Sequence, residues 1–204
     1  MWPVVVLDSL GRTYTLDAAE IPGGRGDGVP VGSLVELQNG AEVAAMISGL
    51  PEQHYLLSNS GGYGFIAKLA DMVGRVKAGK VMISLEAGEK VLPPQAVFTV
   101  SLINPDCKVV LASSANRLLA FALGELKVMA KGRGLQLMNL GEDEKLAHIA
   151  VVSTPEFMVE SVGKRGAARC ERLRIQDIEN KRGRKGRLLE ISGRLKAIGG
   201  TDAE

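Results

Sequence analysis

The sequence predicts an all-β, propeller-like fold of about four to five four-stranded blades, arranged as a closed or an open disc. Three observations support this prediction: a strand–turn–strand pattern that occurs four times, a basic glycine-rich loop that follows each copy, and poor periodicity for long amphipathic helices. Glycine is also frequent, with 25 among 204 residues. Since glycine usually makes up about 7% of a protein, this content is typical of a chain with many tight turns.

The first mark of the repeat is a pair of apolar runs around a small turn. It reads "VVVLDSLGRTYTL", "YLLSNSGGYGFIA", "VVLASSANRLLAF" and "FMVESVGKRGAAR". The turn residues are Gly11, Gly62, Asn116 and Gly163. Because glycine and asparagine tolerate positive φ angles, the pattern predicts four β-hairpins.

The second mark is a basic, glycine-rich loop downstream of each hairpin, which reads "GGRGDG", "GRVKAGK", "AKGRG" and "NKRGRKG". The last glycines of the loops are Gly28, Gly79, Gly134 and Gly186. A further strand-like run and a turn follow each loop, at "QNGAEV", "EAGEKV", "LGEDEKL" and "SGRLKAI". We therefore predict one domain over 1–204, with repeats at about 4–54, 55–106, 107–155 and 156–199 and a tail at 200–204. A short helical turn is expected within residues 172–179.

The net charge of +2 conceals an asymmetry along the chain. From Ser161 onward there are 12 Lys and Arg against 6 Asp and Glu, whereas residues 1–160 hold 13 and 17. A basic end on a mildly acidic body favours an anionic polymer as partner.

Several classes of protein are disfavoured. No apolar run approaches the ~18 residues of a membrane span, and no signal peptide is evident. Cys107 and Cys170 have no partner pattern, which argues against a disulfide scaffold or a metal site and favours a reducing cytoplasm.

The loops suit phosphate binding, because glycine allows backbone N–H groups to approach a phosphate while Arg and Lys supply charge. Equivalent loops of repeated blades should lie on one rim, where they would contact duplex DNA without reading its sequence. The candidate DNA-binding residues are Arg25, Arg75, Lys77, Lys80, Lys131, Arg133, Lys164, Arg165, Lys181, Arg182, Arg184, Lys185 and Arg187. The alternative is that each loop is an ordinary solvated turn; four loops in register favour the functional interpretation.

Other candidate chemistry is weaker. His54 and His148 occupy unrelated repeat positions, and Ser113 and Ser114 have no apparent base, so we expect no catalytic residue, metal or cofactor site in this chain. The aromatic content of 4%, with none in the basic loops, disfavours a single-strand platform built on base stacking.

With these features in hand, the chain resembles the C-terminal β-pinwheel domains of the type IIA topoisomerase A subunits, within them the proteobacterial topoisomerase IV branch. The resemblance spans essentially the whole chain and is carried by "PVVVLDSLGRTYTLDAAEIP", "GGYGFIAKLADMVGRVKAGKVMISL", "GEKVLPP" and "KRGRKGRL". It implies a disc whose basic outer rim binds and bends duplex DNA. Gyrase A subunits carry a box, Q-R-R-G-G-K-G, for tight wrapping; its nearest match is "NKRGRKG" at 180–186, with Asn180 for Gln and Arg184 for a Gly. Moderate bending is therefore expected rather than strong wrapping.

The resemblance also implies the setting of the domain. The parent would be an ATP-hydrolysing, Mg-using type II topoisomerase of A2B2 composition, acting in decatenation and supercoil relaxation. It would be cytoplasmic and nucleoid-associated, with peripheral association at the inner membrane as one alternative. The fragment is expected to be monomeric and non-catalytic, and the alternative role is a protein-interaction module for a condensin-like partner. Members of this branch usually have five blades, so we expect a first blade, or part of one, to precede the chain.

Overall fold

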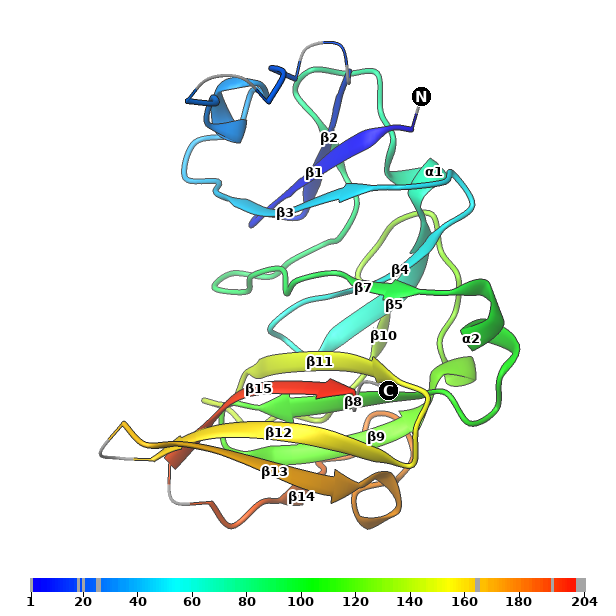
Figure 1. Cartoon of the computed structure of the whole chain (residues 1–204), viewed down its shortest axis with the longest axis vertical. Helices are drawn as coiled ribbons and strands as arrows, with labels where there is room; N and C mark the ends of the chain where they lie inside the picture. The colour runs from blue at the N-terminus through cyan, green and yellow to red at the C-terminus, as the bar shows by residue number, and fades with distance from the viewer. Residues whose placement is uncertain are drawn as a thin grey trace.

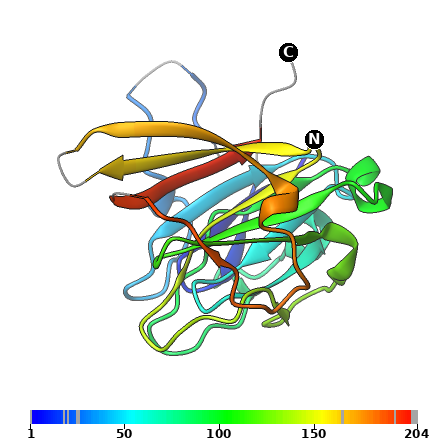
Figure 2. The same ribbon diagram turned by 90° about the horizontal axis from the view of Figure 1, so that it is seen from below.

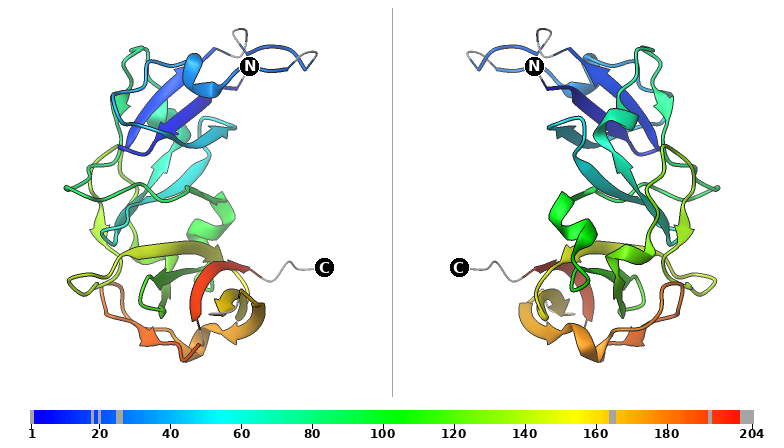
Figure 3. Two further views of the ribbon diagram at one scale, coloured as in Figure 1. Left: turned by 90° about the vertical axis from the view of Figure 1, so that its left-hand side faces the viewer. Right: turned by 90° about the vertical axis from the view of Figure 1, so that its right-hand side faces the viewer.

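Four antiparallel sheets, here called blades 1 to 4, follow one another in chain order along an open stack (Figure 1). This is a computed structural model, which describes residues 2–17, 19, 21–24, 27–163, 166–191 and 193–200. The side views show blade 1 at one end and blade 4 at the other, so the stack does not close into a ring (Figure 3). The view from below shows the same blades stacked behind one another (Figure 2). The predicted all-β class and propeller-like architecture are confirmed, in the open form.

The strands of each blade, in spatial order, come from more than one repeat. Blade 1 contains β3 (Val43–Ser48), β1 (Val4–Asp8), β2 (Arg12–Leu16) and β6 (Lys80–Val81). Blade 2 contains β10 (Leu135–Gln136), β5 (Tyr63–Lys68), β4 (His54–Ser58) and β7 (Gln95–Val97). Blade 3 contains β11 (Leu146–Val152), β8 (Lys108–Ser113), β9 (Arg117–Ala122) and β14 (Arg187–Leu188). Blade 4 contains β13 (Ala168–Arg174), β12 (Glu156–Gly163) and β15 (Gly193–Gly200).

The helical elements are short. They are η2 (Val31–Ser33), α1 (Leu69–Met72), α2 (Thr99–Ile103), η3 (Leu123–Glu125) and η4 (Ile175–Asp177). The last of these lies in the segment where a helical turn was predicted. Within the part of the chain that the structure describes, no helix is long and apolar enough to cross a membrane.

The four predicted hairpins are confirmed as β1–β2, β4–β5, β8–β9 and β12–β13. Gly11, Gly62 and Asn116 have φ angles of 84°, 83° and 57°, as their turns require. The fourth turn was placed wrongly at Gly163. That residue ends β12 and still pairs with Gly193 of β15, so the hairpin is longer and its positive-φ glycine is Gly166, at 79°.

Three blades are completed by a two-residue strand from the following repeat. Thus β6 pairs with β2 of the preceding copy, β10 with β5, and β14 with β9. Among the described residues, β13 pairs with β12 alone, so blade 4 has three strands rather than the four expected. Consecutive blades 1 to 3 are therefore tied to their neighbours by main-chain hydrogen bonds as well as by side-chain packing.

The first repeat departs from the prediction of a strand after its loop. The 3-10 helix η2 follows Gly28 instead, after Pro30. Proline has no N–H to donate to a ladder, and this chain contains no earlier hairpin with which the segment could pair. Val31, Leu34 and Leu37 pack instead on Tyr14 and other buried side chains at the outer face of blade 1.

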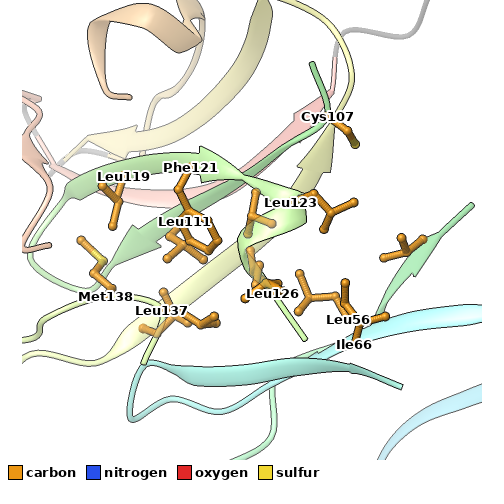
Figure 4. Close-up of a cluster of buried hydrophobic side chains, with 14 residues drawn as sticks. Leu56, Ile66, Cys107, Leu111, Leu119, Phe121, Leu123, Leu126, Leu137 and Met138 are labelled. Atoms are coloured by element: carbon orange, nitrogen blue, oxygen red, sulfur yellow. The ribbon is translucent and has the colours of Figure 1, made fainter. Parts of the chain in front are cut away.

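Alternate faces of each blade fill the spaces between blades. In blade 2, Leu57 and Phe65 pack in a cluster with blade 1, whereas Leu56 and Ile66 pack in a cluster with blade 3. The second cluster includes Phe121 and lies between the two sheets (Figure 4). Each fully buried Leu or Phe contributes about 1.5–3 kcal/mol by leaving water. The blades thus form one continuous stack on which the loops have fixed relative positions.

Candidate nucleic-acid interface

The basic loops of repeats 2, 3 and 4, here called loop 2 (74–79), loop 3 (130–134) and loop 4 (180–186), end in glycines with left-handed backbones. Gly79, Gly134 and Gly186 have φ angles of 68°, 86° and 78°. A Cβ on Gly134 would lie 2.2 Å from the carbonyl oxygen of Gly64, and one on Gly186 would lie 2.7 Å from that of Leu118. Glycine is therefore required by both conformation and space, because the loop passes directly over the hairpin of the preceding copy.

After each glycine the chain crosses the preceding hairpin turn in the same way. The carbonyl oxygen of Gly11 accepts hydrogen bonds from Met82 N and Ile83 N, at 2.9 and 3.1 Å. The carbonyl oxygen of Gly62 accepts from Leu137 N at 2.7 Å, and that of Asn116 accepts from Leu189 N at 2.9 Å. The two sequence marks that keep step along the chain are thus in direct contact in space, one repeat apart.

Neighbouring loops are also hydrogen-bonded to one another. Gly132 N donates to Met82 O at 2.9 Å, which joins loop 3 to the segment after loop 2. Gly183 N donates to Leu137 O at 2.8 Å, and Asn139 N donates to Arg184 O at 3.0 Å, which joins loop 4 to the segment after loop 3. Loops 2, 3 and 4 therefore follow one another in a line along the stack.

In loop 2, Arg75 and Lys77 are exposed, and their side chains make no hydrogen bond or ion pair with the described residues. They line a groove of about 280 Å³ between loop 2 and the segment that follows loop 1, which also contains Glu36. Lys80 is half-buried, and its Nζ donates to Val73 O at 3.4 Å.

Loop 3 contains one exposed and one engaged cation. Lys131 is exposed. Arg133 binds Glu86 at 2.6 Å and Glu89 at 2.7 Å, and its guanidinium lies 4.2 Å from the centre of the Tyr63 ring. These contacts occupy the guanidinium on three sides, so Arg133 holds the loop against the turn at 86–90.

Loop 4 and the residue after it carry five cations in two kinds of environment. Lys181, Arg184 and Lys185 are exposed, and their side chains make no hydrogen bond or ion pair with described residues. Arg182 instead donates to Gln136 O of β10, and Arg187 donates to Asp177 O at 3.0 Å. Two arginines anchor the loop while three cations project from it.

The remaining predicted site residues, Arg25, Lys164 and Arg165, lie outside the described residues.

Sequence reasoning missed an arginine that supports loop 2. Arg12 begins β2 and donates to Ala78 O and Gly79 O, at 3.2 and 3.0 Å. It also missed exposed Arg194 at the start of β15, which lies in the turn quoted as "SGRLKAI" and falls into repeat register once the strand pairing is known.

Catalytic or metal chemistry has little support in this geometry. His148 is half-buried, with Nε2 3.4 Å from Leu195 O, and burial lowers its pKa, partly offset by that backbone contact. His54 lies in blade 2, whereas His148 lies in blade 3. Among the described residues, no group of three His, Cys, Asp or Glu side chains is placed to hold a metal ion.

Comparison with known proteins agrees with this architecture. The family model described as "DNA gyrase C-terminal domain, beta-propeller" matches residues 108–153. The chain is 66% identical over 188 residues to the DNA topoisomerase 4 A subunit of Neisseria gonorrhoeae, covering 92% of this chain and 24% of that protein. It is 34% identical over 195 residues to the corresponding protein of Haemophilus influenzae, covering 91% and 25%. The chain thus spans about a quarter of the length of these relatives.

Solved structures give the same result. The E. coli ParC C-terminal domain is 30% identical, with a TM-score of 0.84, and the match covers 96% of this chain and 80% of that one. A DNA gyrase A C-terminal domain, 20% identical, shares the fold with a TM-score of 0.70 over 97% of this chain and 64% of that one. Given the crossed-over strands, the loops in line and these matches, the chain belongs to the family of C-terminal β-pinwheel domains of DNA topoisomerase IV A subunits.

Proposed function

We propose that this domain binds duplex DNA through the cations that project from loops 2, 3 and 4, bends it moderately, and is itself non-catalytic. The observation that carries the proposal is the hydrogen-bonded line of loops, which presents Arg75, Lys77, Lys131 and the three free cations of loop 4 along one path. Such contacts neutralise phosphates without reading bases, so binding should be independent of sequence. Arg133 and Arg182 support the loops rather than lead the contact.

The open stack offers a path along which a duplex would bend. Bending a site of 20–30 base pairs costs on the order of 1–6 kcal/mol, which the phosphate contacts must offset. Loop 4 keeps the cations and glycines of the gyrase box except where Arg184 stands for a glycine, and loop 1 contributes little because Asp27 opposes Arg25. Moderate bending fits this distribution better than tight wrapping.

In this proposal the domain serves an ATP-hydrolysing, Mg-using A2B2 type II topoisomerase of the cytoplasm and nucleoid. By holding DNA segments beside the cleavage site, it would direct substrate choice in decatenation and supercoil relaxation. The nucleotide and metal chemistry would belong to other parts of that enzyme.

A salt series tests the proposal. A labelled 40-base-pair duplex and a scrambled duplex of equal length should bind equally, with affinity falling steeply as salt rises. End-labelled energy transfer on the same duplex should report bending. Absence of binding at low salt would overturn the proposal.

A second candidate function, docking of a condensin-like protein, is favoured by one observation. Strand β13 is exposed along most of its length and has one free edge, which a strand of another protein could extend. Reversing the charges of Arg182, Arg184 and Lys185 separates the two functions, since it should abolish DNA binding and leave such docking intact.

A further inference from the structure

A second basic site lies beside the hairpin turn of blade 3. It is a groove of about 370 Å³ whose polar lining comes from Ser113, Ser114, Asn116, His148, Arg194 and Lys196. None of these residues belongs to the basic loops. The groove therefore needs an explanation of its own.

Asn116 builds the groove by tying β15 to the turn. Its side-chain Nδ2 donates to Gly193 O at 2.8 Å, and its Oδ1 accepts from Leu195 N at 3.0 Å. The equivalent turn residues of blades 1 and 2 are Gly11 and Gly62, which have no side chain for this purpose. Arg194, between the two tethered residues, thus has a backbone fixed relative to the turn.

The polar groups of the groove include free donors. Arg194 is exposed, and its side chain makes no hydrogen bond or ion pair with described residues. Ser114 Oγ accepts from Lys145 N, which leaves its own proton available. The carboxylates nearby are committed: Glu160 binds Lys196 at 3.0 Å, and Glu144 accepts from Ser113 Oγ and lies 3.8 Å from Arg117 Nε.

Strand register shows that this slot is basic only in blade 4. Val43, Val91, Leu146 and Leu195 pair with Asp8, Asn59, Ser113 and Ser161, at the end of the first hairpin strand in each copy. The residues just before them are Glu42, Lys90, Lys145 and Arg194. Carboxylates crowd the two lysines: Glu86 and Glu89 share the turn of Lys90, and Glu142, Asp143 and Glu144 precede Lys145. The turn before Arg194, residues 189–193, contains Glu190 alone.

The groove also lies next to loop 4. Arg187, which follows that loop, pairs with Leu118, and Asn116 at the groove is two residues further along the same hairpin. Two residues of a strand span about 7 Å. On duplex DNA the charges of one strand are spaced by about 3.4 Å along the helix axis, so this distance covers only a few phosphates.

We propose that this groove binds a backbone phosphate of the duplex where it passes from loop 4 onto blade 4, with the Arg194 guanidinium and the Ser114 hydroxyl as donors. The inference rests on the proposed function. It predicts a DNA contact at blade 4 that has no counterpart at the acidic turns of blades 2 and 3.

The first test compares Arg194→Ala with Lys145→Ala, the register-equivalent control, on a 40-base-pair duplex across a salt series. Loss of one phosphate contact should lower the slope of log K against log salt by about 0.9, which corresponds to about fivefold weaker binding at 0.15 M. Lys145→Ala should bind within about twofold of the wild type, a smaller change than the loss of one contact. Circular dichroism of both variants checks that they fold.

The second test uses the wild-type protein alone. It has two histidines, His54 in blade 2 and His148 in the groove, so their imidazole proton resonances are readily distinguished. Adding the duplex should shift the resonances of His148 and leave those of His54 unchanged.

The outcomes separate the inference from its foundation. If neutralising Lys181, Arg184 and Lys185 weakens binding while Arg194→Ala does not, and His148 does not shift, the groove site is wrong and the loop interface stands. If neither variant weakens binding, the proposed function fails as well.

Discussion

Loops 3 and 4 occupy the same slot in successive repeats, yet they present their charges differently. Both end in a positive-φ glycine and both lead into a strand that completes the preceding blade. In loop 3 the arginine is held by Glu86, Glu89 and Tyr63, which leaves Lys131 exposed. In loop 4 three cations are free of partners among the described residues. A basic residue in the repeat slot is thus not by itself a phosphate contact, because its local partners decide whether it is available.

The largest expected effect follows from removing the free cations of loop 4. Replacing Lys181, Arg184 and Lys185 together by Ala should lower the salt slope by about 2.7, which corresponds to a loss on the order of 100-fold in duplex affinity at 0.15 M salt. Replacing Lys131 in loop 3 should lower the slope by only about 0.9. Fluorescence anisotropy over a salt series measures both. Equal slopes for the two variants would show that the loops do not differ as their contacts suggest.

The second prediction concerns the backbone that the two loops share. Gly134→Ala should lower the free energy of unfolding by about 3 kcal/mol or more, because the new Cβ meets the Gly64 backbone and φ is positive. Gly28 is the control: its φ is also positive, at 73°, but a Cβ there would have no atom within 4 Å. Gly28→Ala should therefore cost only about 1–2 kcal/mol. Urea unfolding compares them, and similar losses would contradict a steric role for Gly134.

The third prediction tests the engaged arginine of loop 3. Arg133→Met should lower stability by about 1–3 kcal/mol, because Glu89, whose side chain is 12% exposed, loses its partner. Its effect on the salt slope should be much smaller than that of Lys131→Ala. Urea unfolding and the same anisotropy series give both values. A slope reduced by a full contact, with unchanged stability, would make Arg133 a phosphate ligand instead.

Much of this comparison was predictable from sequence, because it depends on spacing. Turn residues and loop glycines kept step over 204 residues, which indicated the blades, the hairpins and the loops. The exchange of strands between repeats was not predictable, since a two-residue strand such as Lys80–Val81 has no periodicity of its own. The engagement of Arg133 was also hidden, because Glu89 lies 44 residues away and reaches it only through that exchange. Gly163 was mistaken for a turn because the pattern of the longer fourth hairpin contains two glycines.

The smallest expected effect concerns His148, beside loop 4. Burial lowers the pKa of its ring in the folded protein below the ordinary value of 6.5. Below that pH the unfolded chain therefore binds more protons at this residue than the folded one, so stability rises with pH. The contribution is fully present above pH 6.5 and is lost as the pH falls towards the lowered value. His148→Gln should accordingly lose less stability than the wild type between about pH 7.5 and about pH 5, as measured by urea midpoints. Ser114→Ala, which changes the same groove without removing a titratable group, should keep the pH dependence of the wild type; if it matched His148→Gln, the groove's packing rather than the imidazole would cause the acid sensitivity.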